Sequence, residues 1–244
     1  MARIIFFDTE TTGNGGTDRL CQLAVKARGV TKPIVNATHK PPVPISIDSM
    51  VVHHITPKMV ADRPPFENAP EYAELKALFE DPEVIAVAHN AAFDVAMLAR
   101  EGINVAQTIC TYKLAHGLDE EGRLPNYRLQ YLRYLLDLDV EGTAHDALGD
   151  VLVLEALFER LLAKVVETHG SEEAALAEML DRSHRPMLFT TIRFGKHAGK
   201  KLEDVARADA SYLKWLLAEK RKDPVAEADW IFTIEHYLTA ISRS

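Results

Sequence analysis

The sequence contains only two cysteines, no internal repeat, no low-complexity tract and no apolar stretch long enough to span a bilayer. Cys21 and Cys110 lie far apart in the sequence, and each sits in an apolar run, which predicts reduced core cysteines rather than a disulfide pair. They also lack the close spacing of a Cys-x-x-Cys metal site. Met1 leads into a short apolar segment that does not resemble a signal peptide. These absences predict a cytoplasmic protein with no membrane span and no disulfide framework.

Apolar residues, by contrast, are abundant. They make up 47% of the 244 residues, which is enough for one full core and a second small one. Strand-like patterns lie near residues 3–8, 20–28, 33–38, 83–88 and 105–110. Helical patterns lie at about 70–80, 91–101, 111–116, 127–136 and 146–168. Early strands followed by strand–helix alternation predict an α/β fold with a mixed central β-sheet flanked by helices.

The first apolar run, residues 4–7, ends in two carboxylates one residue apart, Asp8 and Glu10. Side chains alternate faces along a β-strand, so these two carboxylates are expected to point the same way. Two like charges at the end of a buried strand repel each other and lose hydration. A divalent cation with carboxylate ligands relieves both costs, and we interpret the pair as part of a metal site. The alternative is an edge turn whose acids lie in water.

Two further segments, residues 84–94 and 143–150, carry polar residues next to apolar patterns. Taken alone, Asn90 could be a helix N-cap, and Asp94 could be an acid in a first helical turn, where the helix dipole favours negative charge. We interpret Asp146 in this way, as a helix cap. Capping alone does not readily explain four acids in this order with a histidine five residues before the last.

The three segments around Asp8, Asp94 and Asp150 resemble the three motifs of the DEDD exonucleases, a superfamily with a ribonuclease H-like fold. Its branches differ in having a histidine five residues, or a tyrosine four residues, before the last aspartate. His145 precedes Asp150 by five residues, so the chain resembles the histidine branch, DEDDh. The resemblance covers roughly residues 1–165.

This resemblance implies a metal-dependent 3′→5′ exodeoxyribonuclease that releases nucleoside 5′-monophosphates from the 3′ ends of single-stranded or duplex DNA in repair or recombination. Two divalent ions, Mg²⁺ or Mn²⁺, would be held by Asp8, Glu10, Asp94 and Asp150. His145 would take the proton from the attacking water, because an imidazole titrates close to neutral pH. The alternative for His145 is a solvent-exposed histidine before a helix. RNA remains a possible substrate, since the choice of sugar depends on pocket shape.

The resemblance also suggests substrate contacts. The Thr11 backbone and the Asn90 and Phe93 side chains would face the terminal nucleotide. Residues 50–56 resemble a family stretch that packs against the terminal base and sugar, and His53 fits that pattern. Without the resemblance, His53 would be assigned to a surface loop and Phe93 to the core.

Charge is distributed unevenly along the chain. Residues 182–222 hold 11 Lys and Arg against 4 Asp and Glu, a net of +7, whereas residues 1–181 hold 16 against 28, a net of −12. We expect the basic segment to offer a phosphate-binding surface, with Lys196, Lys200 and Lys201 as its candidates. The alternative is a solvated face that is rich in lysine.

This basic segment has its own structural pattern. Residues 190–194 alternate like a strand, residues 195–200 form a turn, and two helical runs follow, which predicts a small β-hairpin and helical module. We expect an exonuclease domain at 1–168, a linker at 169–187 and a basic module at 188–244. The sequence motif Phe-Gly-Lys-x-x-Gly-Lys at residues 194–200 resembles part of the C-terminal region of one exodeoxyribonuclease group of the same superfamily.

Other functions compete with this one. A proofreading subunit of a DNA polymerase, or a 3′→5′ exoribonuclease, would use the same chemistry, although no clamp-binding segment of the Gln-Leu-x-Leu-Phe type is evident. A nucleic-acid-binding module without catalysis would be expected to lack one or more of the four acids or His145, and all five are present. A His-Asp phosphohydrolase would need a mostly helical domain, which a central strand ending in Asp8 argues against.

Overall fold

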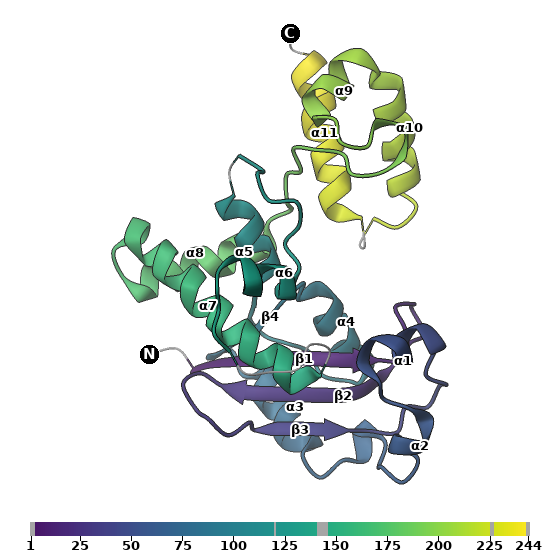
Figure 1. The fold of residues 1–244 in the computed structure, drawn as a ribbon, viewed down its shortest axis with the longest axis vertical. Helices are drawn as coiled ribbons and strands as arrows, with labels where there is room; N and C mark the ends of the chain where they lie inside the picture. The colour runs from purple at the N-terminus through teal and green to yellow at the C-terminus, as the bar shows by residue number, and fades with distance from the viewer. Residues whose placement is uncertain (1–2, 120, 141–145, 225–226, 243–244) are drawn as a thin grey trace. The chain divides into compact units, whose positions relative to one another are not determined.

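The computed structural model describes residues 3–119, 121–140, 146–224 and 227–242. The chain divides into two compact units, and we treat each by itself (Figure 1). Unit 1 comprises Met1–Ala115 and Asn126–Ser183, and unit 2 comprises His116–Pro125 and His184–Ser244. Helix α8 (Glu172–His184) occupies most of the segment 169–187 that we expected to be a linker, and the boundary between the two units, after Ser183, falls within that segment.

Unit 1 is built on a five-stranded sheet in the order β3-β2-β1-β4-β5. The strands are β1 (Arg3–Thr11), β2 (Leu20–Ala27), β3 (Val35–Thr38), β4 (Val84–Ala88) and β5 (Thr108–Cys110). The pairs β1–β2 and β2–β3 are antiparallel, and the pairs β1–β4 and β4–β5 are parallel. The predicted mixed sheet is therefore confirmed, and β1 lies at its centre, where both faces are covered.

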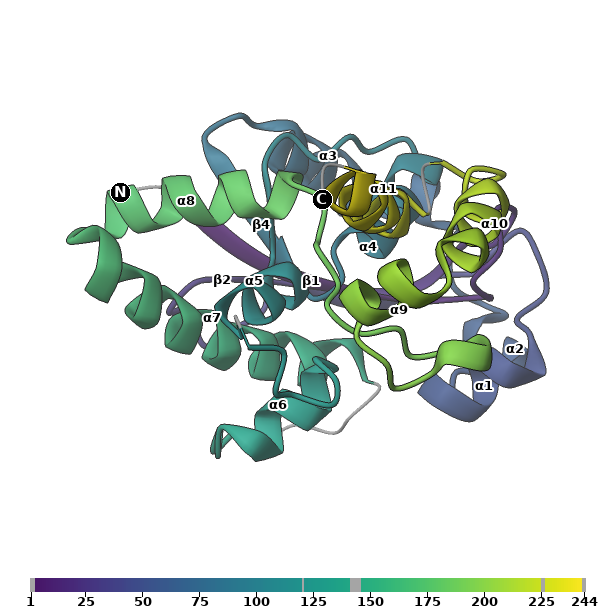
Figure 2. The same ribbon diagram turned by 90° about the horizontal axis from the view of Figure 1, so that it is seen from above.

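Helices cover both faces of this sheet (Figure 2). On one face, the ring of Phe6 lies 5.3 Å from that of Phe158 in α7 (Ala147–His169). On the other, Phe7 lies 5.0 Å from Phe79 in α3 (Tyr72–Glu80). Because faces alternate along β1, Asp8 shares the face of Phe6 and points to the side that α7 covers.

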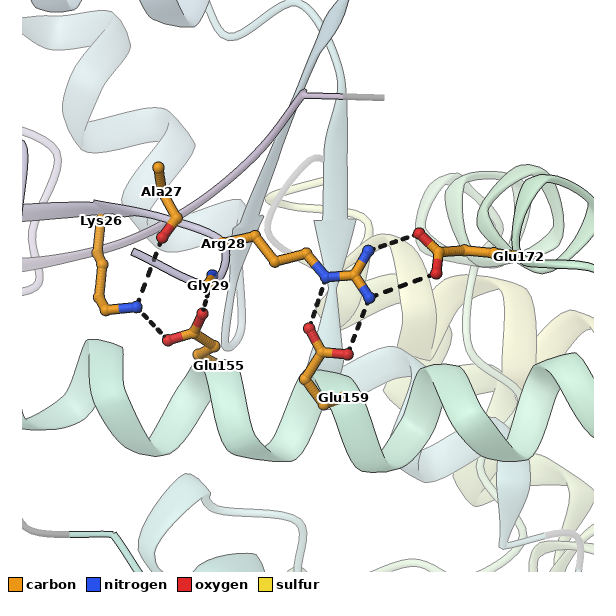
Figure 3. Close-up of polar contacts among 7 residues, drawn as sticks. All are labelled: Lys26, Ala27, Arg28, Gly29, Glu155, Glu159 and Glu172. Carbon is orange, nitrogen blue, oxygen red and sulfur yellow. Dashed lines mark hydrogen bonds and ion pairs between the residues drawn. The ribbon is translucent and has the colours of Figure 1, made fainter. Parts of the chain in front are cut away.

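Ion pairs connect α7 to residues at the carboxyl end of β2 (Figure 3). Lys26, which pairs with Phe6 across the strands, makes a buried ion pair with Glu155 of α7. The Arg28 guanidinium donates to Glu159 of α7 at 2.6 Å and to Glu172 of α8 at 2.5 Å. These charge-assisted contacts, together with the aromatic packing, set the position of the helix that begins at the acidic cluster.

The remaining elements of unit 1 frame the loops beside the sheet. They are α1 (Ile47–His53), α2 (Pro57–Val60), the 3₁₀ turn η1 (Phe66–Asn68), α4 (Ala92–Arg100) and α6 (Leu129–Leu135). Helix α5 (Thr111–Leu118) begins in unit 1 and ends in the first segment of unit 2. The helices that were predicted from periodicity all exist, and their ends differ from the prediction by at most two residues.

Unit 2 is helical, with the 3₁₀ turn η2 (Gly195–His197) followed by α9 (Leu202–Ala208), α10 (Ala210–Lys220) and α11 (Ala228–Ser242). Its core contains Ile192, Leu202, Val205, Ala206, Leu213, Leu216 and Ile234. The segment His116–Pro125 is connected to the rest of unit 2 by Arg193, which donates hydrogen bonds to the carbonyls of Leu124 and Pro125.

The predicted hairpin is present in short form. Thr191 and Lys201 form an antiparallel bridge, the Ile192 N–H donates to the Lys200 carbonyl at 3.0 Å, and the Leu202 N–H donates to the Thr190 carbonyl at 2.8 Å. The return segment ends at Leu202, where α9 begins, because Leu202, Val205 and Ala206 recur at helical spacing and bury one face in the core.

Candidate active site

The structure brings three of the predicted acids together beside the carboxyl end of β1. Asp8 and Glu10 lie on the face covered by α7, and Asp150 lies in the first turn of that helix. Each of the three offers a carboxylate oxygen, and these oxygens all lie within 4.8 Å of one another. A β-bulge between Glu10 and Thr11 disturbs the pairing with β2 at this point, as is common beside functional sites.

The fourth acid, Asp94, is hydrogen-bonded to the same strand. It lies in the first turn of α4, and its Oδ1 accepts hydrogen bonds from the Thr9 backbone N at 3.1 Å and the Thr9 hydroxyl at 2.6 Å. Only 4% of Asp94 is exposed. A solvated acid at a helix start therefore does not describe this residue, because it is buried and fixed to the strand that carries Asp8.

Burial and mutual repulsion make these carboxyl groups hard to ionise. Burial, followed by the charges of Asp94, Glu10 and Asp150, raises the pKa of Asp8 well above its ordinary value. Burial, followed by the charges of Asp150, Asp94 and Asp146, raises the pKa of Glu10 to about 8. Burial also raises the pKa of Asp94 to about 7, although the hydrogen bonds from Thr9 oppose that shift.

A divalent cation fits this arrangement. The donors are carboxylate oxygens, which hard cations such as Mg²⁺ and Mn²⁺ prefer. Positive charge at the cluster would restore the ionised forms that burial and repulsion disfavour. Asp8, Glu10 and Asp150 can hold one ion, and Asp94 is coupled electrostatically to the same group.

Two glutamines that the sequence analysis did not assign to the site donate hydrogen bonds to Asp150 and to the residue that caps its helix. The Gln130 amide of α6 donates to Asp150 Oδ1 at 2.5 Å, and the Gln22 amide of β2 donates to Asp146 at 3.2 Å. Asp146 also accepts from Gly149 N, which confirms it as the N-cap of α7. The sequence could suggest Gln130 only as a polar residue inside a leucine-rich helix, since its partner comes from another element.

His53 and Thr11, two of the predicted substrate residues, are in contact. His53 is buried at the end of α1, and its Nε2 lies 3.1 Å from the Thr11 carbonyl while its Nδ1 lies 3.0 Å from the Ile55 N–H. Nε2 therefore donates and Nδ1 accepts, as in a neutral imidazole, and burial lowers the pKa of His53. The alternative of a surface loop is wrong for His53.

Asn90 lies between β4 and α4, and Phe93 lies in the first turn of α4. Asn90 is exposed with φ at 62°, in the left-handed region that asparagine tolerates better than most residues. Its side chain does not cap α4, because the cap is Ala91 and has no side-chain hydrogen bond. Phe93 is partly buried and packs against the core of unit 1, in agreement with the core alternative.

The other candidates are placed as follows. His145 lies outside the described residues, so its position stays a prediction from the sequence. Lys196, Lys200 and Lys201 are exposed in unit 2, and Lys196 Nζ lies 2.7 Å from the carboxylate of Asp209. Among the described residues, no helix has the length and apolar character needed to cross a membrane.

Comparison with known proteins identifies the family. Residues 5–158 match the exonuclease family. This chain belongs to that family. The expected enzyme class, a 3′→5′ exonuclease, and the ribonuclease H-like fold are confirmed. A second match, to the exodeoxyribonuclease X-like C-terminal family, covers residues 192–220, where the Phe-Gly-Lys phrase had indicated exodeoxyribonuclease X.

Individual relatives agree with this assignment. The chain is 34% identical to Exodeoxyribonuclease 10 of Escherichia coli strain K12 over 241 residues, which is 98% of this chain and 99% of that protein. A structure of Exonuclease X in complex with 5′ overhanging duplex DNA is 28% identical with a TM-score of 0.57, covering 74% of this chain and 99% of that one. E. coli Exonuclease I in complex with a dT13 oligonucleotide shares the fold, at 19% identity and a TM-score of 0.56, over 72% of this chain and 46% of that one.

Proposed function

We propose that this exonuclease is a metal-dependent exodeoxyribonuclease that releases nucleoside 5′-monophosphates from the 3′ ends of DNA, and that it acts in the cytoplasm in DNA repair or recombination. The observation that carries the proposal is the approach of the Asp8, Glu10 and Asp150 carboxylates to within 4.8 Å at a strand end, with Asp94 fixed to the same strand. Such an acidic group suits an anionic substrate only when cations are bound.

The proposed metal ligands are divided between two ions. Asp8, Glu10 and Asp150 would hold one, and Asp8 and Asp94 would hold the other. When bound, divalent metals lower the pKa of a water nucleophile and stabilise charge on the attacking and leaving oxygens. Gln130 and Thr9 restrict the orientation of Asp150 and Asp94, because each donates a hydrogen bond to one carboxylate oxygen.

Other residues of the chain act on the substrate and the proton. His145 removes the proton from the attacking water, which requires a neutral imidazole. The Thr11 backbone, with His53 fixed against its carbonyl, and the exposed Asn90 contact the terminal nucleotide. Phe93, which is only partly buried, also contacts the terminal nucleotide in this proposal.

The basic surface of unit 2 supplies additional affinity for DNA in this proposal. Lys200 and Lys201 are exposed and placed to bind phosphate, whereas the charge of Lys196 is shared with Asp209. We infer that the two units are separate domains with separate roles, cleavage in unit 1 and DNA retention in unit 2. Limited proteolysis that releases stable fragments at the unit boundaries would support this division, and uniform degradation would oppose it.

The choice of DNA rests on the relatives. The chain covers almost the whole of Exodeoxyribonuclease 10, including the C-terminal region, which favours an independent exodeoxyribonuclease over a proofreading subunit. The alternatives are a proofreading exonuclease and a 3′→5′ exoribonuclease, which use the same site chemistry.

The test uses 5′-labelled single-stranded DNA, duplex DNA and RNA of one sequence, each with Mg²⁺. We expect ladders that shorten from the 3′ end on DNA, nucleoside 5′-monophosphates as products, intact RNA and no reaction in EDTA. Ladders on RNA alone would make the protein an exoribonuclease. Binding of DNA without cleavage, in saturating Mg²⁺ or Mn²⁺, would instead indicate a binding module.

A further inference from the structure

Unit 2 leaves a tryptophan in solvent beside its core. Trp215 lies on α10 and is 56% exposed, more than any other large apolar side chain in the described part of this unit. Its neighbours Leu213 and Leu216, at 0% and 4% exposed, form the buried face of the same helix. A tryptophan on the outer face does not stabilise this core, and an exposed aromatic ring is a common feature of a binding surface.

The ring of Trp215 packs against a second aromatic ring, that of Tyr212. Its centroid lies 5.6 Å from that of Tyr212 at an interplanar angle of 38°. Lys196 Nζ lies 4.9 Å from the centroid of the Tyr212 ring, and Asp209 pairs with the same ammonium at 2.7 Å. Tyr212 is therefore held by a cation–π contact, and it gives Trp215 a fixed neighbour, which reduces the entropy cost of binding a ligand.

Unit 2 also carries positive charge that no carboxylate neutralises. Three of the six lysines of the basic segment are paired with acids: Lys196 with Asp209, Lys220 with Glu227 and Lys222 with Glu219. Among the residues that the structure describes, three lysines of this unit have no such partner: Lys200, Lys201 and Lys214.

These three lysines lie close in sequence to Trp215 or to Lys196, which contacts Tyr212. Lys214 is adjacent to Trp215 on α10, and Lys200 and Lys201 follow the turn that carries Lys196 over Tyr212. An exposed ring with unpaired cations of one sign fits a ligand that has flat apolar faces and repeated negative charge. Single-stranded nucleic acid has both, whereas a duplex hides its base faces in the stack.

We propose that unit 2 is a single-strand-binding surface on which an unpaired base stacks on Trp215 while Lys200, Lys201 and Lys214 contact the phosphates. This inference rests on the proposed function, because it assumes a nucleic-acid substrate. It extends that function by naming the strand form that unit 2 holds and by replacing Lys196 with Lys214 as a free cation.

The intrinsic fluorescence of tryptophan provides a probe for this proposal. It contains two tryptophans, Trp215 and Trp230, and both belong to unit 2. Trp230 is partly buried, with its ring 4.6 Å from Phe189 and 5.0 Å from Phe194. In a Trp230→Phe variant, tryptophan fluorescence therefore reports on Trp215 alone, and it can be followed in EDTA so that no DNA is cleaved.

We expect an oligo-dT to quench this fluorescence, since base stacking quenches indole emission, and a blunt duplex to quench it much less. Trp215→Leu should weaken oligo-dT binding about tenfold, as measured by anisotropy of a labelled oligonucleotide. Trp215→Tyr should restore part of the affinity. The matched control is Phe232→Leu, which removes another exposed aromatic of unit 2, 42% exposed on α11, and should leave binding unchanged. Unchanged thermal melting of each variant verifies folding.

Oligo-dT binding with undiminished affinity in Trp215→Leu, or without any change in Trp215 emission, would overturn the proposal. A change in emission that depends on protein concentration in the absence of DNA would overturn it as well, by assigning the ring to contact with a second copy. The proposed function fails separately: Trp215 can respond to oligo-dT in EDTA even if no polymer is cleaved in Mg²⁺, and cleavage can occur without a response.

Discussion

The two units differ in the sign and the burial of their charged groups: unit 1 buries a cluster of carboxylates, and unit 2 exposes lysines and arginines. In unit 1, carboxylates that are distant in sequence are forced together and buried, so their pKa values rise and a cation is needed to complete the group. In unit 2, cations lie on the surface and several are paired with acids, so fewer are available to a ligand than the sequence contains. A buried cluster depends on every member, whereas a solvated surface loses little when one charge is removed.

The largest expected effect comes from removing one member of the acidic cluster. Asp8→Ala should abolish nearly all nuclease activity and weaken Mg²⁺ binding, because Asp8 is proposed to contact both ions. The melting temperature of the metal-free protein should not fall, since a repelling carboxylate is deleted. Asp146→Asn is the matched control, because asparagine caps a helix as well as aspartate does and Asp146 is no proposed ligand. Wild-type activity in Asp8→Ala would disprove the metal site.

A smaller effect is expected at the proposed base. His145→Ala should reduce kcat by roughly 10²- to 10⁴-fold, the usual share of a general base. Mg²⁺ affinity, measured by calorimetry, should stay at the wild-type level. Loss of metal binding in this variant would make His145 a ligand instead.

The pH dependence of stability tests the electrostatic cost of the cluster. In metal-free protein, the pKa of Glu10 is raised to about 8 and that of Asp94 to about 7, above their values in the unfolded chain. Ionisation is then harder in the folded state, so stability is present at acid pH and is lost as pH rises from about 4 to about 8. We expect a fall of roughly 5–10 °C in Tm over that range.

Two comparisons verify the cause of this fall. Glu10→Gln should flatten the dependence of Tm on pH, because it removes one of the carboxyl groups with a raised pKa. Mg²⁺ should raise Tm more at pH 8 than at pH 5, since it favours the ionised forms. A Tm that rises from pH 5 to pH 8 in EDTA would contradict the electrostatic account.

Gln130 should have a moderate, specific effect. Gln130→Ala removes the donor to Asp150 Oδ1, and loss of such a supporting contact commonly weakens metal affinity by about 10-fold or more. The Mg²⁺ concentration for half-maximal activity should therefore increase, and excess Mg²⁺ should restore most of kcat. Tyr134→Ala, an exposed change on the same helix, serves as the control. A drop in kcat that Mg²⁺ cannot restore would argue against a positioning role.

The smallest effects are expected at the lysines. Lys200→Gln, Lys201→Gln and Lys214→Gln should each flatten the slope of log affinity against log salt by about 0.7 on single-stranded DNA. Lys222→Gln should not, because Glu219 already neutralises that ammonium at 2.7 Å. Equal slopes for paired and unpaired lysines would show that only the net charge of unit 2 matters.

Local pattern alone predicted much of unit 1. The apolar run before Asp8 predicted a central strand, and the twofold period of a strand placed Asp8 and Glu10 on one face. The sheet was predicted for the same reason, since its strands are apolar enough to be recognised singly. These features depend on backbone geometry, which is the same wherever the segment lies.

Prediction from the local sequence pattern was less accurate for short segments, because their structure depends on packing against other parts of the chain. The hairpin after Thr190 is short, and its return segment gives way to a helix at Leu202 because Leu202 and its neighbours are buried in a core made with other helices. Helix α8 was missed because the apolar stripe that it buries, Ala175, Leu176 and Met179, is short and weak.

The sequence by itself determined which residues this protein has for chemistry and which strand face two of them share. Only the tertiary structure decided which partners they have: Thr9 for Asp94, Gln130 for Asp150, the Thr11 carbonyl for His53. It also decided that the charge of Lys196 is paired while that of Lys214 is free. Charge and residue type are local properties, but burial and pairing depend on distances between segments that only the folded chain brings together.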